Sequence, residues 1–136
     1  MKKKNLSIIL SVAVVALAAV LISCTSSDGI MTKKKGVYTI NTTTLSQDIK
    51  GYNGPTPLII TIEKDKIVKV EALENAETPR FFEHMTKGGM LDRWNGMTVD
   101  DALNAKVDVV AGATFSSNAI IENVRLGLNY YKEHKK

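Results

Sequence analysis

The sequence predicts an α+β fold: a single small domain with an antiparallel sheet, packed helices and a long C-terminal helix, preceded by a signal-peptide helix. The chain has 136 residues, a length that fits one domain. Its middle carries a strand-like hairpin pattern, and its last part carries a long helical pattern. We expect a signal peptide over residues 1–23, a linker over 24–35 and the folded domain over 36–136.

The formal net charge of +4 belongs mainly to the start of the chain. Three of the 18 basic residues lie at positions 2–4, so the chain beyond the signal peptide holds 15 basic residues against 14 acidic ones. A nucleic-acid-binding domain needs a clear basic excess to neutralise phosphates, and this domain has none. With one cysteine and two histidines, the chain also lacks a disulfide framework and the ligands of a Cys/His metal centre.

Residues 1–24 follow the plan of an export signal, with lysines at 2–4, an apolar run over 6–22 and a small residue, Ser23, before Cys24. The tetrad that ends at Cys24 resembles the lipobox of bacterial lipoproteins, and this resemblance implies a diacylglycerol on the Cys24 sulfur. A plain transmembrane anchor is the alternative, because the apolar run reaches the lower limit for a bilayer span. We therefore expect an extracytoplasmic protein of the cell envelope that lipidated Cys24 anchors to a membrane.

Strand patterns follow the linker. A loop is expected at 51–57, where glycine, proline and asparagine gather. Beyond it, two arms joined by Lys64 and Asp65 predict a hairpin, and the second arm alternates with a period of two. The predicted strands are 37–41, 58–63 and 66–73, with 45–50 extending the first or pairing with it.

Two short helices are expected next. Thr78 and Pro79 have the residue types of an N-cap and a first helical position, and two glycines at 88–89 end that helix. A short helical turn follows at 90–94. Thr98 and Asp101 resemble a capping box, which predicts another helix start.

The segment 107–118 is the most informative part of the chain. The β-branched run 107–110 predicts a strand, Gly112 ends it, and Ser116 or Ser117 opens the longest helix, which ends near residue 133. Such a junction directs backbone N–H groups and the positive end of the helix dipole at one place, and thus favours a phosphate. The hydroxyls of Thr114, Ser116 and Ser117 are placed to contact that phosphate. Ordinary helix capping is the simpler explanation of this local pattern.

The same segment resembles the flavinylation motif of the FMN-binding domain family, found in subunits of the sodium-pumping NADH:quinone reductase and of the Rnf complex. The matching residues are Asp108, Gly112, Ala113, Thr114 and Ser116. The resemblance implies that Thr114 carries FMN as a phosphoester, attached by a separate magnesium-dependent flavin transferase. Ala111 departs from the family pattern, which has Ser or Thr at that position.

The resemblance extends from Tyr52 to the end of the chain. The triplet Glu77, Thr78 and Pro79 matches a loop that the family sets against the isoalloxazine ring, which implies that these residues bind the cofactor. With the Thr114 motif and Ser117, they complete the expected cofactor site. The aromatic residues Phe81, Phe82 and Trp94 are candidates for stacking on a flavin, and core packing is the alternative for each.

The resemblance implies an exported, lipid-anchored electron-transfer flavoprotein that takes electrons from a membrane oxidoreductase or another redox partner. The chain has no nicotinamide-binding fingerprint and no nucleophile–base pair, so we expect an electron carrier rather than a stand-alone enzyme. One alternative is a module of the same fold that binds FMN or another anion noncovalently, without redox turnover. A structural lipoprotein with a capped helix and no ligand is the other.

Overall fold

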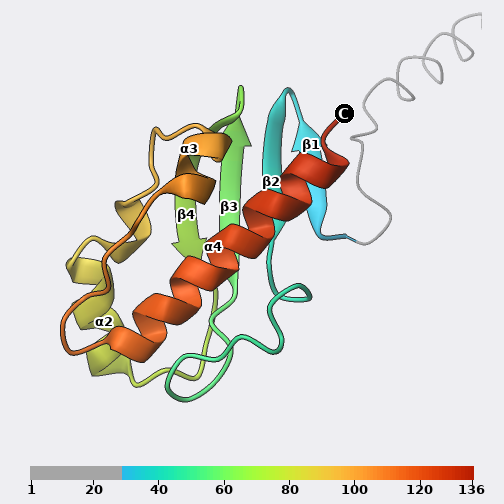
Figure 1. Ribbon diagram of the computed structural model, residues 1–136. Coiled ribbons are helices and arrows are strands. Elements are labelled where there is room, and N and C mark those ends of the chain that lie inside the picture. The colour runs from blue at the N-terminus through green and yellow to red at the C-terminus, as the bar shows by residue number, and fades with distance from the viewer. Residues whose placement is uncertain (1–28) are drawn as a thin grey trace, which may run out of the picture.

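The computed structural model describes residues 29–136, and the predictions of a signal peptide and of lipidated Cys24 lie outside this part of the chain. One four-stranded antiparallel sheet has the strand order β1-β2-β3-β4, and a long helix crosses one of its faces (Figure 1). The strands are β1 (Met31–Lys34), β2 (Val37–Asn41), β3 (Leu58–Glu63) and β4 (Lys66–Ala72). The helices are α2 (Pro79–Lys87), the 3-10 turn η1 (Met90–Asp92), α3 (Val99–Asn104) and α4 (Thr114–His134). The predicted fold class is confirmed.

The core lies between the sheet and α4. The residues that fill it from these two elements are Ile40, Leu58, Ile60 and Ile62 of the sheet and Ile120, Val124 and Leu128 of α4. Burying each such side chain contributes about 1.5–3 kcal/mol. Gly127 marks the closest approach of the helix, because a Cβ there would lie 2.6 Å from Ile60 Cδ1. The stripe of apolar residues predicted on the C-terminal helix is therefore the face that holds it on the sheet.

Strand β1 corrects the predicted boundary of the domain. The linker expected over 24–35 includes Met31–Lys34, which pairs antiparallel with β2 in the register Met31↔Ile40. Ile30 and Met31 are buried, and Lys35-Gly36 forms the tight turn into β2 with positive φ at both residues. The lysines obscured this strand in the sequence, although charged side chains are usual on an edge strand.

The predicted hairpin is confirmed, with β3 and β4 joined at Lys64 and Asp65, but the period-two pattern of its second arm breaks. Thr61 pairs with Lys69 while Ile62 pairs with Ile67, so Val68 is an extra residue in a β-bulge. The bulge puts Ile67 and Val70 in the core and leaves Val68 half exposed.

Two predicted strands are absent from the described residues. The segment 45–50 forms turns, and 107–110 has no strand partner. Hydrogen bonds from Ile67 N to Met97 O and from Gly96 N to Ile67 O occupy the edge of β4 that a further strand would need. The β-branched run therefore stays irregular, and α4 begins at Thr114, two or three residues earlier than the expected start at Ser116 or Ser117.

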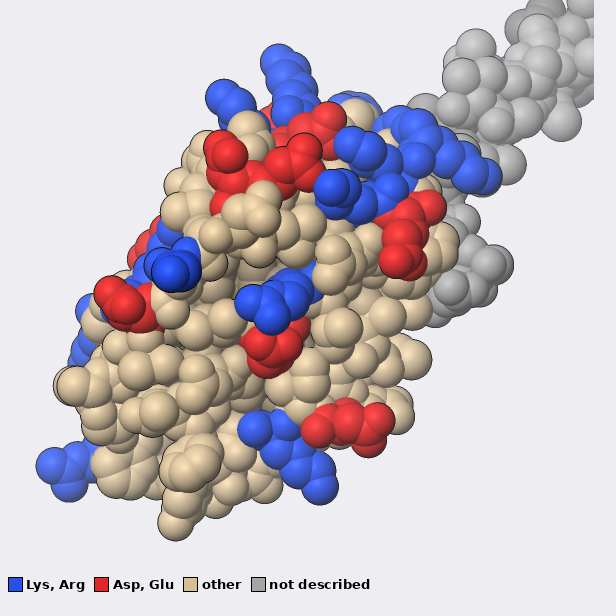
Figure 2. All heavy atoms as spheres, in the orientation of Figure 1, with Lys and Arg blue, Asp and Glu red and all other residues tan. Residues whose placement is uncertain are grey.

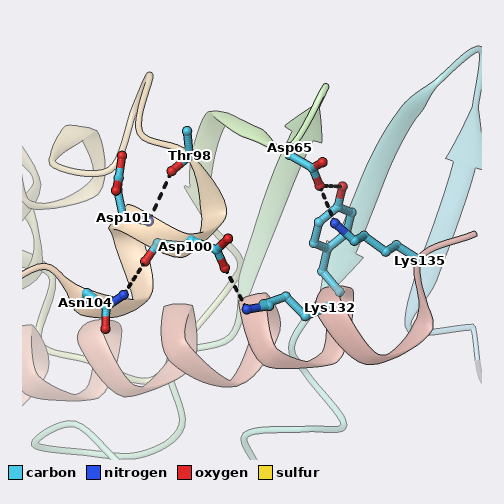
Figure 3. Close-up of polar contacts among 8 residues, drawn as sticks. Asp65, Thr98, Asp100, Asp101, Asn104, Lys132 and Lys135 are labelled. Atoms are coloured by element: carbon cyan, nitrogen blue, oxygen red, sulfur yellow. Dashed lines mark hydrogen bonds and ion pairs between the residues drawn. The ribbon is translucent and has the colours of Figure 1, made fainter.

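The start of α2 at Pro79 and of α3 at Val99 agree with the predicted helix starts. Thr98 caps α3 by accepting a hydrogen bond from Asp101 N at 3.1 Å (Figure 3). Thr78 stands at the N-cap position of α2, but its hydroxyl does not cap the helix.

Polar contacts pin the C-terminal half of α4 to the β3–β4 turn and to α3 (Figure 3). The carboxylate of Asp65 accepts from the Tyr131 hydroxyl at 2.6 Å and from Lys135 Nζ at 2.7 Å. Lys132 pairs with Asp100 at 2.6 Å. The hydrogen bonds from Lys135 and Tyr131 hold the pKa of Asp65 below its usual value, while burial and Asp65 raise the pKa of Tyr131. These contacts add to the apolar packing that holds the C-terminal half of α4 on the sheet.

Candidate functional site

A cavity of about 290 Å³ opens at the N-terminal end of α4. Four segments that are distant in sequence meet there: the loop after residue 50, the turn before α2, the first turn of α2 and the start of α4. Its lining residues are Tyr52, Glu77, Thr78, Phe81, Gly112, Ala113, Thr114, Phe115 and Ser116. The structure therefore brings together the two motifs that the sequence singled out, around residues 77–78 and 112–116.

Glu77 joins two walls of this cavity. Its Oε1 accepts from Asn53 N at 2.8 Å and from Gly54 N at 3.3 Å, and its Oε2 accepts from Tyr52 N at 3.1 Å and from the Ser116 hydroxyl. The side chain is 6% exposed. A Cβ on Gly51 would lie 2.8 Å from the Glu77 carboxylate, so glycine lets the loop wrap around it.

These donors determine the ionisation of Glu77. Burial disfavours the charged carboxylate, but the Ser116 hydroxyl and the three backbone N–H groups of the loop outweigh it and hold the pKa of Glu77 below its usual value. Because all these groups donate to it, the carboxylate is ionised at neutral pH, and it holds the loop in place through the loop's N–H groups.

The N-terminus of α4 is open toward the cavity. Gly112, with φ of +83°, turns the chain, and Ala113 occupies the N-cap position without a side-chain cap. The first helical hydrogen bond runs from Ser117 N to Ala113 O at 2.9 Å, so the N–H groups of Thr114, Phe115 and Ser116 precede it. The structure does not support ordinary helix capping as the explanation of this motif.

The three hydroxyls of the motif have different surroundings. Ser116 donates to Glu77, and Ser117 accepts from Val110 N at 3.1 Å, so both hydroxyls are buried and engaged within the protein. Thr114 is exposed and lines the cavity. Of the three, Thr114 is thus the hydroxyl that a ligand or an enzyme can reach.

Three exposed aromatic rings surround the opening: Tyr52, Phe115 and Phe81 are 73%, 67% and 54% exposed. The rings of Tyr52 and Phe115 have centroids 6.2 Å apart and planes tilted by 51°. Exposed aromatic side chains gathered at one cavity are typical of a ligand-binding surface. Sequence reasoning did not single out Tyr52 or Phe115 as site residues, although Phe115 follows the motif threonine directly and Tyr52 lies in the glycine-rich loop.

Some predicted residues lie elsewhere. Trp94 is 2% exposed and belongs to the core, and half-buried Phe82 packs against it, so core packing is the outcome for both. Asp108, Pro79 and Ser117 do not line the cavity. The carbonyl of Asp108 accepts from Arg93 Nη1 at 2.6 Å. The Thr78 hydroxyl accepts from Asn53 Nδ2 at 3.1 Å, which ties the loop to the start of α2.

The cavity end of the molecule carries little charge. Glu77 is the only charged residue among the described lining residues, and its carboxylate is enclosed by donors. Figure 2 shows charged side chains gathered toward the opposite end, while the surface around the start of α4 is mainly uncharged. The arrangement suits a ligand with a large uncharged ring, which the aromatic walls can contact, and an anionic group, which the open N-terminus of α4 can bind.

Residues 51–129, more than half of the chain, match the FMN-binding domain family. The chain belongs to this family. It is also 29% identical, over 97 residues, to a subunit of the ion-translocating oxidoreductase complex of Shewanella piezotolerans (strain WP3 / JCM 13877). That match covers 62% of this chain and 46% of the relative, so the chain spans about half the length of the curated relative. Between residues 29 and 136, no helix is both long enough and apolar enough to cross a membrane.

Proposed function

We propose that this FMN-binding domain protein is an exported electron carrier that holds FMN through a phosphoester to Thr114. The observation that carries the proposal is the position of the Thr114 hydroxyl, exposed at the uncapped start of α4 and on the wall of the aromatic cavity. The family match supports FMN as the ligand. The name of the relative supports an oxidoreductase complex as the redox partner.

The residues of the cavity fit the two halves of FMN. The N–H groups of the first turn of α4 and the positive end of its dipole would hold the phosphate next to Thr114. The space beside Gly112 is open, since no atom lies within 4 Å of a Cβ built there. Tyr52, Phe81 and Phe115 offer apolar faces to the isoalloxazine ring. When bound, FMN supplies one- and two-electron chemistry, which an ester at the phosphate leaves intact.

Attachment would form a bond from the Thr114 hydroxyl oxygen to the phosphorus of a flavin nucleotide donor and break the bond from that phosphorus to the donor's leaving group. The leaving group would depart with the bonding electrons, and a base would take the hydroxyl proton. The described cavity offers no general base for this step, because Glu77 is already held by Ser116 and the loop N–H groups. The chain therefore needs a separate flavin transferase, magnesium-dependent as in the family, to remove the proton.

The remaining parts of the proposal concern location. A lipid anchor at Cys24 would keep the carrier on the outer side of the cytoplasmic membrane or in the periplasm. A covalent bond suits such a place, because noncovalent FMN lost outside the cell has no supply from the cytoplasm. A membrane oxidoreductase would then reduce the protein, which passes the electrons to another carrier.

The test is to co-express the exported protein with a matched flavin transferase and to precipitate it in acid. We expect flavin colour in the washed pellet for the wild type and for Thr114→Ser, which keeps a hydroxyl, and none for Thr114→Val. Flavin that washes off the wild type supports noncovalent binding of FMN in the same cavity. A native protein without flavin contradicts both covalent and noncovalent binding of FMN and favours the alternative of a structural lipoprotein without a ligand. Acid-stable flavin in Thr114→Val overturns the assignment of the site.

A further inference from the structure

The end of the molecule opposite the cavity gathers lysines from three segments that are far apart in sequence. The β1–β2 turn, the β3–β4 turn and the chain after α4 lie at this end, beside the C-terminus (Figure 1). Figure 2 shows Lys and Arg side chains gathered here, with Asp and Glu side chains among them. We call this surface the lysine-rich end and define it by Lys33, Lys34, Lys35, Lys64, Lys66 and Lys136. Among the described residues, none of these six forms an ion pair with a carboxylate side chain, and Lys33 Nζ donates to the main-chain oxygen of Lys136 at 2.9 Å.

A hollow of about 420 Å³ connects the three segments, with Lys33, Lys64 and Lys136 on its lining. Lys33 Nζ lies over the Tyr38 ring, 4.9 Å from its centroid. The acidic side chain of this hollow, Asp65, is held by Lys135 and Tyr131 (Figure 3). The lysines thus present a surplus of positive charge to whatever contacts this end.

Backbone geometry does not explain why lysine stands at the tips of the two turns. Lys35 has φ of 50° and Lys64 has φ of 51°, in the left-handed region that glycine and asparagine occupy at lower cost. Two neighbouring turns thus carry a long cationic side chain where the backbone favours a small residue.

The lysine-rich end and the cavity lie at opposite ends of α4. The helix has 21 residues, which at about 1.5 Å per residue separates the two ends by roughly 30 Å. In the sequence, the apolar run 6–22 and Cys24 come shortly before Gly29, and five extended residues span at most about 18 Å. A chain attached to a membrane at Cys24 therefore keeps this domain within reach of a bilayer, and the lysines can enter the range of about 8 Å over which its surface potential acts.

We propose that the lysine-rich end docks on anionic phospholipid headgroups, so that the cavity faces away from the bilayer at a distance of roughly 30 Å. In this orientation the cavity opens toward redox partners that approach from the aqueous side. The inference rests on the membrane anchor of the proposed function but does not depend on flavin, because it concerns the other end of the molecule. An acidic protein is the competing occupant of this surface.

The experiment measures how fast single lysines are acetylated in the full chain, purified from membranes and reconstituted in vesicles. Vesicles of phosphatidylcholine alone are compared with equal parts of phosphatidylcholine and phosphatidylglycerol. We expect Lys66 and Lys136 to react about fivefold more slowly in the anionic vesicles, and Lys87 and Lys106 of the same molecules to react equally in both. The protection should disappear at about 0.5 M NaCl, where charges are screened within about 5 Å.

A triple variant tests whether the charge itself is responsible. Lys34→Gln, Lys35→Asn and Lys64→Asn remove three charges, and asparagine tolerates the positive φ of both turns. Lys66 and Lys136 should then lose their protection. A matched control, with lysines 69, 87 and 106 changed to glutamine, should keep it.

Three results would overturn the proposal. The first is equal acetylation of Lys66 and Lys136 in both kinds of vesicle. The second is protection that survives in the triple variant or in phosphatidylcholine alone. The third is a lack of protection in anionic vesicles together with protection of the same lysines by a detergent extract of membrane proteins. That result would identify an acidic protein as the occupant.

Discussion

Glu77→Gln is the substitution that most sharply tests how the cavity is assembled. Glutamine keeps the shape of the side chain but turns one acceptor oxygen into an NH₂ donor. With this NH₂ at the Oε2 position, Ser116 can rotate to accept, but the N–H of Tyr52 loses its partner. With the NH₂ at Oε1, the N–H groups of Asn53 and Gly54 both lose theirs.

The first orientation is the less costly one, and its cost can be worked out from the contacts. A hydrogen bond to a charged group contributes about 1.5–3 kcal/mol, and a buried donor without a partner costs about 1–3 kcal/mol. We expect Glu77→Gln to lower the free energy of unfolding by about 3 kcal/mol, which shifts Tm by roughly 12–15 °C in a domain of this size. Glu74→Gln, an exposed carboxylate three residues earlier, is the control and should stay within about 0.5 kcal/mol.

The pH dependence gives an independent check. Because the pKa of Glu77 is lower in the folded protein than its ordinary value of 4.5, its contribution to stability is present above pH 4.5 and is lost as the pH falls through the folded value. The difference in stability between wild type and Glu77→Gln should therefore be large at pH 7 and shrink at acidic pH. Urea unfolding across the pH range measures it. Equal stability at pH 7, or a difference that does not change with pH, would refute this reasoning.

Three further predictions concern single side chains. Trp94→Ala should cost about 3–5 kcal/mol in urea unfolding, while Phe81→Ala should cost less than about 1 kcal/mol, because only Trp94 fills the core; similar losses for both would contradict this contrast. Lys64→Asn should raise the free energy of unfolding by up to about 1 kcal/mol, because asparagine adopts the positive φ of this position at a lower cost than lysine. A loss of stability would argue against strain at this turn. Cys24→Ala should abolish labelling by radioactive lipid precursors and release the domain from membranes or leave its signal uncleaved, and normal labelling would refute the lipid anchor.

Local signals account for the parts of the fold that the sequence predicts well. The Lys64–Asp65 turn, the proline start at Pro79 and the cap at Thr98 each depend on a few adjacent residues, and all three appear in the structure. The strand at Met31–Lys34 forms because it pairs with β2. Residues 107–110 form no strand, because hydrogen bonds to residues 96–97 already occupy the edge of β4. Such outcomes are decided by tertiary neighbours, which a local pattern does not contain.

The site divides in the same way. The motif around Thr114 is continuous in sequence and predicts the helix start that lines the cavity. The wall formed by Tyr52 arises only because Glu77, 25 residues later, holds the loop by its N–H groups. The family resemblance implies that Glu77 binds the cofactor, and the structure shows in addition that its carboxylate organises the loop. Long-range contacts of this kind become visible only once the chain is folded.

The most direct test of the central claim is to locate the flavin on the chain by fragmentation mass spectrometry. Trypsin cuts after Lys106 and Arg125, so a single peptide contains Thr114, Ser116 and Ser117. We predict that fragment ions of the peptide from transferase-treated protein place the added FMN mass on Thr114. An FMN mass on Ser116 or Ser117, or a peptide that stays unmodified, would contradict the account.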